Sequence, residues 1–170
     1  MEYQNKLIIR ILILLFLPFT LFQILSVNIS LYLSFFLLNL FGPVFLIDNF
    51  IFFNNTIVQF IPECSASLAY YLLFFLIIIT KDINFKKRIK MFLLGSLIIL
   101  IINLIRIIIL VLILDKYGFN LFNNLHILTW SILGSILVAL IWIFLIKIYN
   151  ISSIPFYSDF KYLIKKVYRI

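Results

Sequence analysis

The stretch that decides the fold runs from Met91 to Leu114 and reads MFLLGSLIILIINLIRIIILVLIL. Apart from one glycine, its only residues that are not apolar are Ser96, Asn103 and Arg106. Apolar runs longer than about 18 residues are typical of helices that cross a membrane. The stretch therefore predicts a spanning helix that carries an arginine inside its apolar length.

The composition of the whole chain agrees with this prediction. Of its 170 residues, 65% are hydrophobic and 12% are charged, and the mean hydropathy is +1.23. A soluble domain of this size could not bury so much apolar surface. We therefore expect an integral protein of the cell membrane that folds as one compact bundle.

Three more apolar runs bring the predicted number of transmembrane helices to about four. They cover Leu7–Val27, Glu63–Thr80 and His126–Ile146. A cleaved signal peptide is the alternative for the first run, which is long for one and has no small-x-small cleavage site after it. We expect an uncleaved anchor, and the predicted fold class is an all-α integral membrane helical bundle.

The positions of the basic residues predict how these helices are oriented. Lys116 lies between the third and fourth spans, and the basic residues near the other ends of the spans all fall on the opposite side. That side holds Lys6, Arg10, Lys81, Lys86, Lys87, Arg88, Lys90, Lys147, Lys161, Lys165, Lys166 and Arg169. Because cytoplasmic loops carry the excess of lysine and arginine, we expect a multi-pass protein with both termini in the cytoplasm.

The net charge of +8 raises the question of a nucleic-acid partner. We expect none, because no basic domain interleaved with aromatic residues is present. Topology and binding of anionic lipid head groups account for the basic excess.

Residues 29–62 fall on the predicted outer side. Leu31–Phe41 is apolar but too short to cross, so we expect an interfacial helix or a segment that dips into the bundle. Three short runs follow, and they are separated by Asp48-Asn49 and Asn54-Asn55, which suit tight hairpin turns. The runs are Val44–Ile47, Phe50–Phe53 and Thr56–Ile61. They predict a short outer β-meander, which either plugs the bundle or offers a strand edge to an extended peptide.

Arg106 is the most unusual residue of the predicted bundle. It lies eight residues from the outer end of its span, about 12 Å deep at 1.5 Å per residue. A buried arginine costs at least about 2.5 kcal/mol on insertion scales, so it normally faces a wet cavity or a polar partner. Asn103 precedes it by three residues and shares its helical face. The pair predicts either a functional site or a polar clamp between helices.

Cys64 and His126 are the only cysteine and the only histidine, and both fall at the outer ends of predicted spans. We expect Cys64 in the first turn of its helix, where the helix N-terminus and an arginine lower a thiol pKa. We expect His126 at the start of its helix, where a neutral imidazole able to accept a proton is favoured. The alternatives are an inert buried cysteine and an interfacial anchor.

The other polar residues near Cys64 have simpler explanations. Glu63 suits the start of a helix electrostatically, with a direct role in catalysis as the alternative. Ser65 and Ser67 are candidate nucleophiles, but neither is better placed than the thiol. One histidine and one cysteine on different helices give too few ligands for a metal, and four glycines leave no phosphate-binding loop, so we expect no cofactor. A thiol, a base and an arginine from three helices match the requirements of acyl transfer through a thioester.

The residues Glu63-Cys64-Ser65, Asn103-x-x-Arg106 and His126 follow the order and topology of a known family. Over roughly residues 40–147 the chain resembles the exosortase/archaeosortase family of membrane-embedded sorting enzymes. The family usually has glycine after Cys-Ser, where this chain has Ala66.

The resemblance implies a cysteine peptidase or transpeptidase on the outer face of the membrane. Its substrates would be exported proteins with a C-terminal tail made of a short motif, a transmembrane segment and a basic cluster. The cleaved protein would be released or passed to a lipid or glycan acceptor. Cys64 would be the nucleophile, His126 the general base or acid, and Arg106 a stabiliser of charge, with Asn103, Glu63 and Ser65 in support.

This interpretation divides the chain into four parts. They are an anchor at residues 1–28, the outer segment at 29–62, a catalytic transmembrane core at 63–147 and a basic cytoplasmic tail at 148–170. Two other functions fit the same residues. One is a small non-catalytic membrane scaffold or subunit held together by Asn103 and Arg106, and the other is a transporter that binds an anionic substrate at Arg106.

Overall fold

The computed structural model describes residue 12 and residues 18–80 and 83–151. Five α-helices, one 3₁₀ helix and three strands make up the described elements. In chain order they are α2 (Phe19–Leu38), β1 (Val44–Ile47), β2 (Phe50–Phe53), β3 (Thr56–Gln59), the 3₁₀ helix η1 (Pro62–Ser65), α3 (Ser67–Ile79), α4 (Phe85–Tyr117), α5 (Phe119–Leu133) and α6 (Ser135–Ile148). The predicted anchor falls mostly, and the predicted basic tail almost entirely, outside the described residues.

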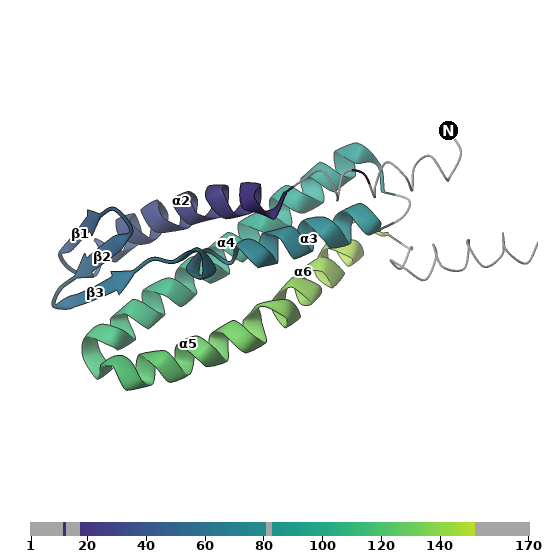
Figure 1. The fold of residues 1–170 in the computed structure, drawn as a ribbon. Coiled ribbons are helices and arrows are strands. Elements are labelled where there is room, and N and C mark those ends of the chain that lie inside the picture. The colour runs from purple at the N-terminus through teal and green to yellow at the C-terminus, as the bar shows by residue number, and fades with distance from the viewer. Residues whose placement is uncertain (1–11, 13–17, 81–82, 152–170) are drawn as a thin grey trace, which may run out of the picture.

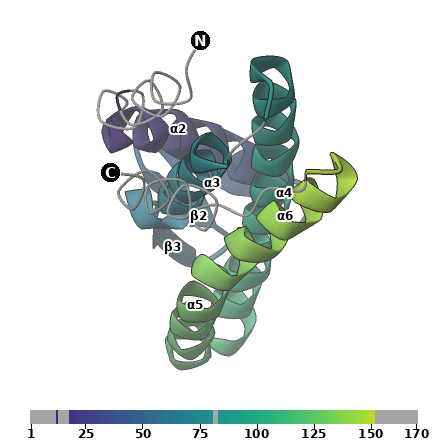
Figure 2. The same cartoon turned by 90° about the vertical axis from the view of Figure 1, so that its right-hand side faces the viewer.

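The helices form a bundle with the small sheet at one end (Figure 1). The junction of α4 and α5 lies at the same end as the sheet, and the start of α4 and the end of α6 lie at the opposite end. Helix α3 packs against α2, α4 and α6, and Figure 2 shows it between α2 and α6. Helices α2 and α4 are long and apolar enough to span a membrane, whereas α3 and α6 are shorter apolar helices.

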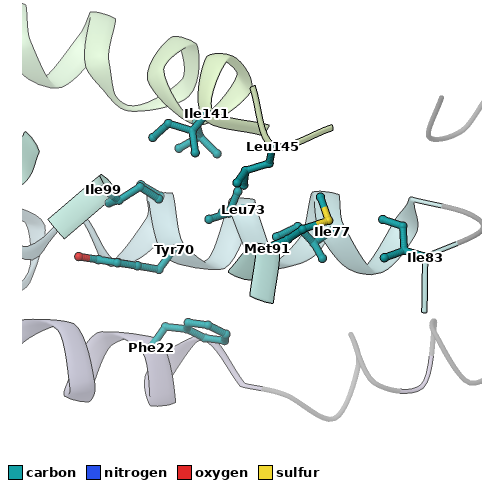
Figure 3. Packing of buried hydrophobic residues seen from close by; sticks show 11 residues of the cluster. Phe22, Tyr70, Leu73, Ile77, Ile83, Met91, Ile99, Ile141 and Leu145 are labelled. Carbon is teal, nitrogen blue, oxygen red and sulfur yellow. The ribbon is translucent and has the colours of Figure 1, made fainter. Parts of the chain in front are cut away.

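The centre of the bundle is a cluster of buried apolar side chains from α2, α3, α4 and α6 (Figure 3). Leu73 of α3 and Leu145 of α6 are fully buried in it. Both approach Gly95 of α4 so closely that a Cβ atom there would lie 2.6 Å from Leu73 Cδ2 and 2.9 Å from Leu145 Cδ1. Small residues at such crossings allow membrane helices to pack closely.

Replacing Gly95 with valine should therefore loosen the crossing of α3, α4 and α6. Overpacking a well-filled core typically costs about 1–3 kcal/mol, and we expect a lower unfolding temperature in detergent. Leu97→Val on the same helix is the matched control, because Leu97 is 53% exposed. Equal unfolding temperatures for the two variants would contradict this packing.

The predicted β-meander is confirmed. The strands pair antiparallel in the order β1-β2-β3, with Val44 opposite Phe53 and Phe53 opposite Thr56. Asp48 and Asn54 stand in the two turns with positive φ angles of 51° and 48°, which asparagine and aspartate adopt more readily than other residues with a side chain. The third strand ends at Gln59, two residues before the predicted end.

The predicted boundary between an anchor and a separate interfacial helix at residues 28 and 29 is wrong. Helix α2 runs through it without a break, from Phe19 to Leu38. The polar residues that indicated a boundary are accommodated within the helix. Asn28 Nδ2 donates a hydrogen bond to the Ile24 carbonyl at 3.1 Å. Ser26, Ser30 and Ser34 recur every four residues and are buried on one face.

The helix predicted to start at Glu63 begins later. Residues Pro62–Ser65 form η1, and α3 starts at Ser67 and has 13 residues. At 1.5 Å per residue, a helix of this length measures about 20 Å. Cys64 therefore lies in a turn ahead of the helix and not in its first turn.

The prediction of a loop at residues 115–125 is also wrong. Helix α4 continues to Tyr117 and α5 starts at Phe119, with Gly118 alone between them at a φ of 79°. Glycine adopts such positive φ angles without steric cost. His126 consequently lies at the middle of α5, about two turns away from the helix N-terminus that the sequence predicts for it. The predicted fourth span is divided between α5 and α6 at Gly134.

Arg88 fixes the opposite end of the bundle. Its guanidinium group donates hydrogen bonds to the carbonyls of Ile77, Ile78, Thr80 and Ile83 at 2.5–3.1 Å. The last carbonyls of a helix have no partner within that helix, and a cation there also complements the helix dipole. Arg88 of α4 thus caps α3.

Candidate functional site

The turn η1 holds Cys64 between the sheet and α3. Its backbone N–H donates to the Ile61 carbonyl at 2.9 Å. Ser65 is fully buried beside it, where its Oγ donates to the Pro62 carbonyl at 2.7 Å and lies 3.0 Å from Ser26 Oγ of α2. These contacts anchor the turn to α2, so Ser65 has a structural role here and is not a free nucleophile.

Ala66 connects η1 to α3 in a left-handed conformation, with φ 55° and ψ 31°. This conformation costs a residue with a Cβ atom roughly 1–2 kcal/mol. The requirement explains why glycine suits the position that follows Cys-Ser. The Ala66 side chain lines two cavities whose walls do not include His126.

Replacing Ala66 with glycine should therefore stabilise the protein. We expect a gain of about 0.5–1 kcal/mol, because the strain that is relieved exceeds the added entropy of the unfolded chain. Thermal unfolding in detergent measures the change. Ala69→Gly, inside α3, is the matched control and should destabilise the protein by a similar amount. A loss of stability in both variants would contradict the conformation at Ala66.

Two side chains of α4 hold the Cys64 backbone. Asn103 Nδ2 and Arg106 Nη2 both donate to the Cys64 carbonyl oxygen at 3.0 Å. The two residues are three apart and therefore lie on one face of the helix. This face fixes the position of the turn that carries the thiol.

Cys64, Arg106 and His126 line one cavity of about 320 Å³. Its remaining walls come from Ile51 of β2, from β3 and the residues that follow it, from the second half of α4 and from the first half of α5. They are Ile51, Ile57, Val58, Gln59, Phe60, Ile61, Ile107, Leu110, Val111, Leu114, Phe119 and Phe122. The structure thus brings together the three residues that the sequence predicts to form a site. It also adds aromatic and strand residues that no sequence pattern indicates.

Two polar atoms of this group are buried without a hydrogen-bond partner. They are Arg106 Nε and His126 Nδ1. The His126 ring stacks on Phe122 with ring centroids 5.6 Å apart and an angle of 14° between the planes. Buried polar atoms are nearly always paired, so unpaired ones indicate a place for a ligand, a water molecule or a reacting group.

The thiol is less acidic than the sequence suggests. Burial raises the pKa of Cys64 above its ordinary value, and the charge of Glu63 adds to this effect. The hydrogen bond with Ile61 and the charge of Arg106 lower the pKa but do not outweigh burial. At neutral pH the thiol is protonated, and a reaction at its sulfur needs a base.

The other predicted residues lie elsewhere. Glu63 and Ser67 line a second cavity of about 400 Å³, to which Arg106 also contributes. Asn103 is buried and acts on the Cys64 backbone. Within the described part of the chain, no three His, Cys, Asp or Glu side chains are grouped to hold a metal ion.

Comparisons of the chain with models of known families, with curated proteins and with solved structures gave no match.

Proposed function

We propose that this protein is a multi-pass membrane cysteine peptidase or transpeptidase that cleaves peptides at the end of the bundle that carries the sheet. The observation that carries the proposal is the pair of unpaired buried atoms, Arg106 Nε and His126 Nδ1, in the residues around the cavity that Cys64 lines. A donor and an acceptor kept free beside a thiol fit an acyl-transfer reaction.

The reaction needs each of the three groups. His126 takes the proton of the Cys64 thiol, and Sγ then attacks the carbonyl carbon of the scissile peptide bond. The carbonyl oxygen gains negative charge and accepts a hydrogen bond from Arg106 Nε. As the C–N bond breaks, His126 returns the proton to the leaving amine, and the acyl group stays on Sγ as a thioester. Water or an amine acceptor attacks the thioester and restores the thiol.

The charges at the two ends of the bundle support a membrane orientation. Lys86, Lys87, Lys90 and Lys147 lie near the start of α4 and the end of α6, and Lys116 lies at the opposite end near the sheet. The rule that cytoplasmic ends carry the basic excess puts the sheet on the outer face. Helix α3 is about 20 Å long and the hydrocarbon core is about 30 Å thick. With the end of α3 at the inner boundary, the turn with Cys64 would therefore lie about 10 Å inside the outer boundary, at a depth similar to that of Arg106, which binds it.

The family resemblance supplies the substrate class. The proposed substrates are exported proteins with a C-terminal tail of short motif, transmembrane segment and basic cluster. A tail anchored in the bilayer would present its motif on the outer side, at the end of the bundle where β3 forms one wall of the cavity that Cys64 lines. The acceptor would be water, a lipid or a glycan.

The same contacts favour a second candidate function, a non-catalytic scaffold. Asn103 and Arg106 both bind the Cys64 carbonyl, and this pair alone could serve to join η1 to α4. A scaffold explains the hydrogen bond from Arg106 Nη2 to the Cys64 carbonyl. It gives no role to the unpaired atoms Arg106 Nε and His126 Nδ1.

Mass spectrometry of protein C-termini in host membranes tests the proposal, with cells that carry the wild type or Cys64→Ala. We expect a set of membrane proteins to lose their C-terminal tails only with the wild type. Identical C-termini in both strains, with the variant present at normal levels, would favour the scaffold.

A further inference from the structure

One edge of the sheet is open along the cavity that contains Cys64. Among the described strands, β3 pairs with β2 only, because the strand order is β1-β2-β3. The Phe60 N–H donates to the Asn49 carbonyl at 2.7 Å, and Ile51 lies opposite Val58. In an antiparallel pair, the residues that bond across the ladder alternate with residues whose N–H and C=O face outward. Ile57 and Gln59 therefore direct their backbone groups away from β2.

The open edge forms one wall of the cavity. Ile57 and Gln59 both line it, and their side chains are exposed. The strand is tied to α4 at both ends. Asn54 Nδ2, in the turn before β3, donates to Asp115 Oδ2 at 2.8 Å, and Arg106 binds the Cys64 carbonyl after it. The edge thus leads along the cavity toward the thiol.

We propose that the substrate binds as an extended strand paired with the outer edge of β3, which places a peptide bond beside Cys64. This inference rests on the proposed function and adds the mode of substrate binding to it. Adding a strand to an open sheet edge is a general way to bind peptides, in which main-chain hydrogen bonds give affinity and pockets for alternate side chains give specificity.

The chemistry of the cavity selects a peptide over other occupants. The outward N–H and C=O groups of Ile57 and Gln59 alternate at strand spacing, and another peptide backbone satisfies both kinds of group. A lipid chain would satisfy neither. The apolar walls from Leu110, Leu114 and Phe119 suit apolar side chains of such a peptide.

The test uses a peptide that reacts with thiols. The probe is acetyl-Thr-Val-Thr-Val with a C-terminal vinyl sulfone, whose vinyl carbon forms a bond to Sγ while the neighbouring carbon takes the proton. Two further forms are N-methylated at alternate residues, one form for each register. Intact mass spectrometry of the full chain in detergent gives the rate of labelling at Cys64.

Only alternate amides of a paired strand face the edge. We therefore expect one N-methylated form to label at least about 10-fold more slowly than the other, since it loses hydrogen bonds to the edge that the other form keeps. Gln59→Pro should reduce this difference, because it deletes one outward N–H and so weakens the pairing, while the bonds to β2 remain. Gln59→Ala keeps that N–H and is the reference for the proline variant.

The outcomes separate the two proposals. Equal labelling by both N-methylated forms, each faster than with ethyl vinyl sulfone, would overturn strand pairing and leave the peptidase proposal standing. Peptide probes no faster than ethyl vinyl sulfone would overturn both. Iodoacetamide reports on the thiol without a peptide, and its labelling rates in Gln59→Pro and Gln59→Ala should agree within about 2-fold, since both variants keep the bonds of β3 to β2. A larger difference would mean that the proline variant has moved the turn and would contradict the edge geometry.

Discussion

The Cys64→Ala variant should lose tail cleavage by a factor on the order of 10⁴ to 10⁶ and still fold normally. A loss of this size is typical when the nucleophile of a covalent mechanism is removed. Folding should survive because Asn103 and Arg106 bind the backbone carbonyl of Cys64, which alanine retains. The thiol itself makes no contact that alanine would leave unsatisfied, since a buried cysteine behaves as a small apolar residue.

Purified protein in detergent allows both parts of this prediction to be measured. Cleavage of a tail-bearing protein identified in host membranes gives the activity, and the unfolding temperature gives the stability. Ser67→Ala is the matched control and should cleave normally, because Ser67 does not line the cavity that contains Cys64. A Cys64→Ala protein that cleaves at more than about one hundredth of the wild-type rate would exclude the thiol as the nucleophile.

The pH dependence of alkylation tests the state of the same thiol. Burial raises the pKa of Cys64, and only the thiolate reacts with iodoacetamide at a useful rate. Labelling should therefore be slow at pH 7 and rise about tenfold per pH unit until the pH passes the raised pKa.

Local turn chemistry explains which parts of the fold could be predicted from the sequence. Asp48-Asn49 and Asn54-Asn55 tolerate positive φ angles, and the two hairpins therefore lie where the pattern indicates. The apolar run around Arg106 predicts α4 in the same way, because a long apolar run indicates a helix without information from distant parts of the chain.

The other helix boundaries depend on contacts that the pattern of apolar and polar residues in the sequence does not reveal. The predicted boundary at residues 28 and 29 does not exist, because the Asn28 side chain bonds to the Ile24 carbonyl and α2 continues. Gly118 was expected within a loop, whereas it alone separates two helices. The spacing of Ser26, Ser30 and Ser34 in the sequence is itself a signal for a tightly packed helix face.

The three central residues of the site could be named from their rarity, but their contacts could not. Only the structure shows that Arg106 donates to the carbonyl of Cys64 and keeps Nε unpaired. The raised pKa of the Cys64 thiol could not be predicted either, because burial of the thiol depends on how β3, α4 and α5 pack around it. Long-range packing thus decides the chemistry of residues that the sequence identifies.

Arg106→Gln should reduce cleavage by about 10² to 10³, the usual cost of losing one donor to a developing oxyanion. It should also destabilise the protein by about 1.5–3 kcal/mol, because a charged hydrogen bond to the Cys64 carbonyl is lost. Asn103→Ala removes the neutral donor to the same carbonyl and is the matched control. If Arg106 only joins η1 to α4, the two variants should lose activity in proportion to their loss of stability.

The alkylation profile of Cys64 gives an independent measure of the Arg106 charge. Arg106 lowers the pKa of the thiol and Glu63 raises it. Arg106→Gln should therefore move the profile to higher pH, and Glu63→Gln should move it to lower pH. Opposite shifts would place the guanidinium charge next to the sulfur, where the proposed reaction needs it, whereas a profile that neither substitution moves would remove Arg106 from the chemistry. Because labelling of the thiol does not depend on any substrate, this result holds whether or not the natural tails have been identified.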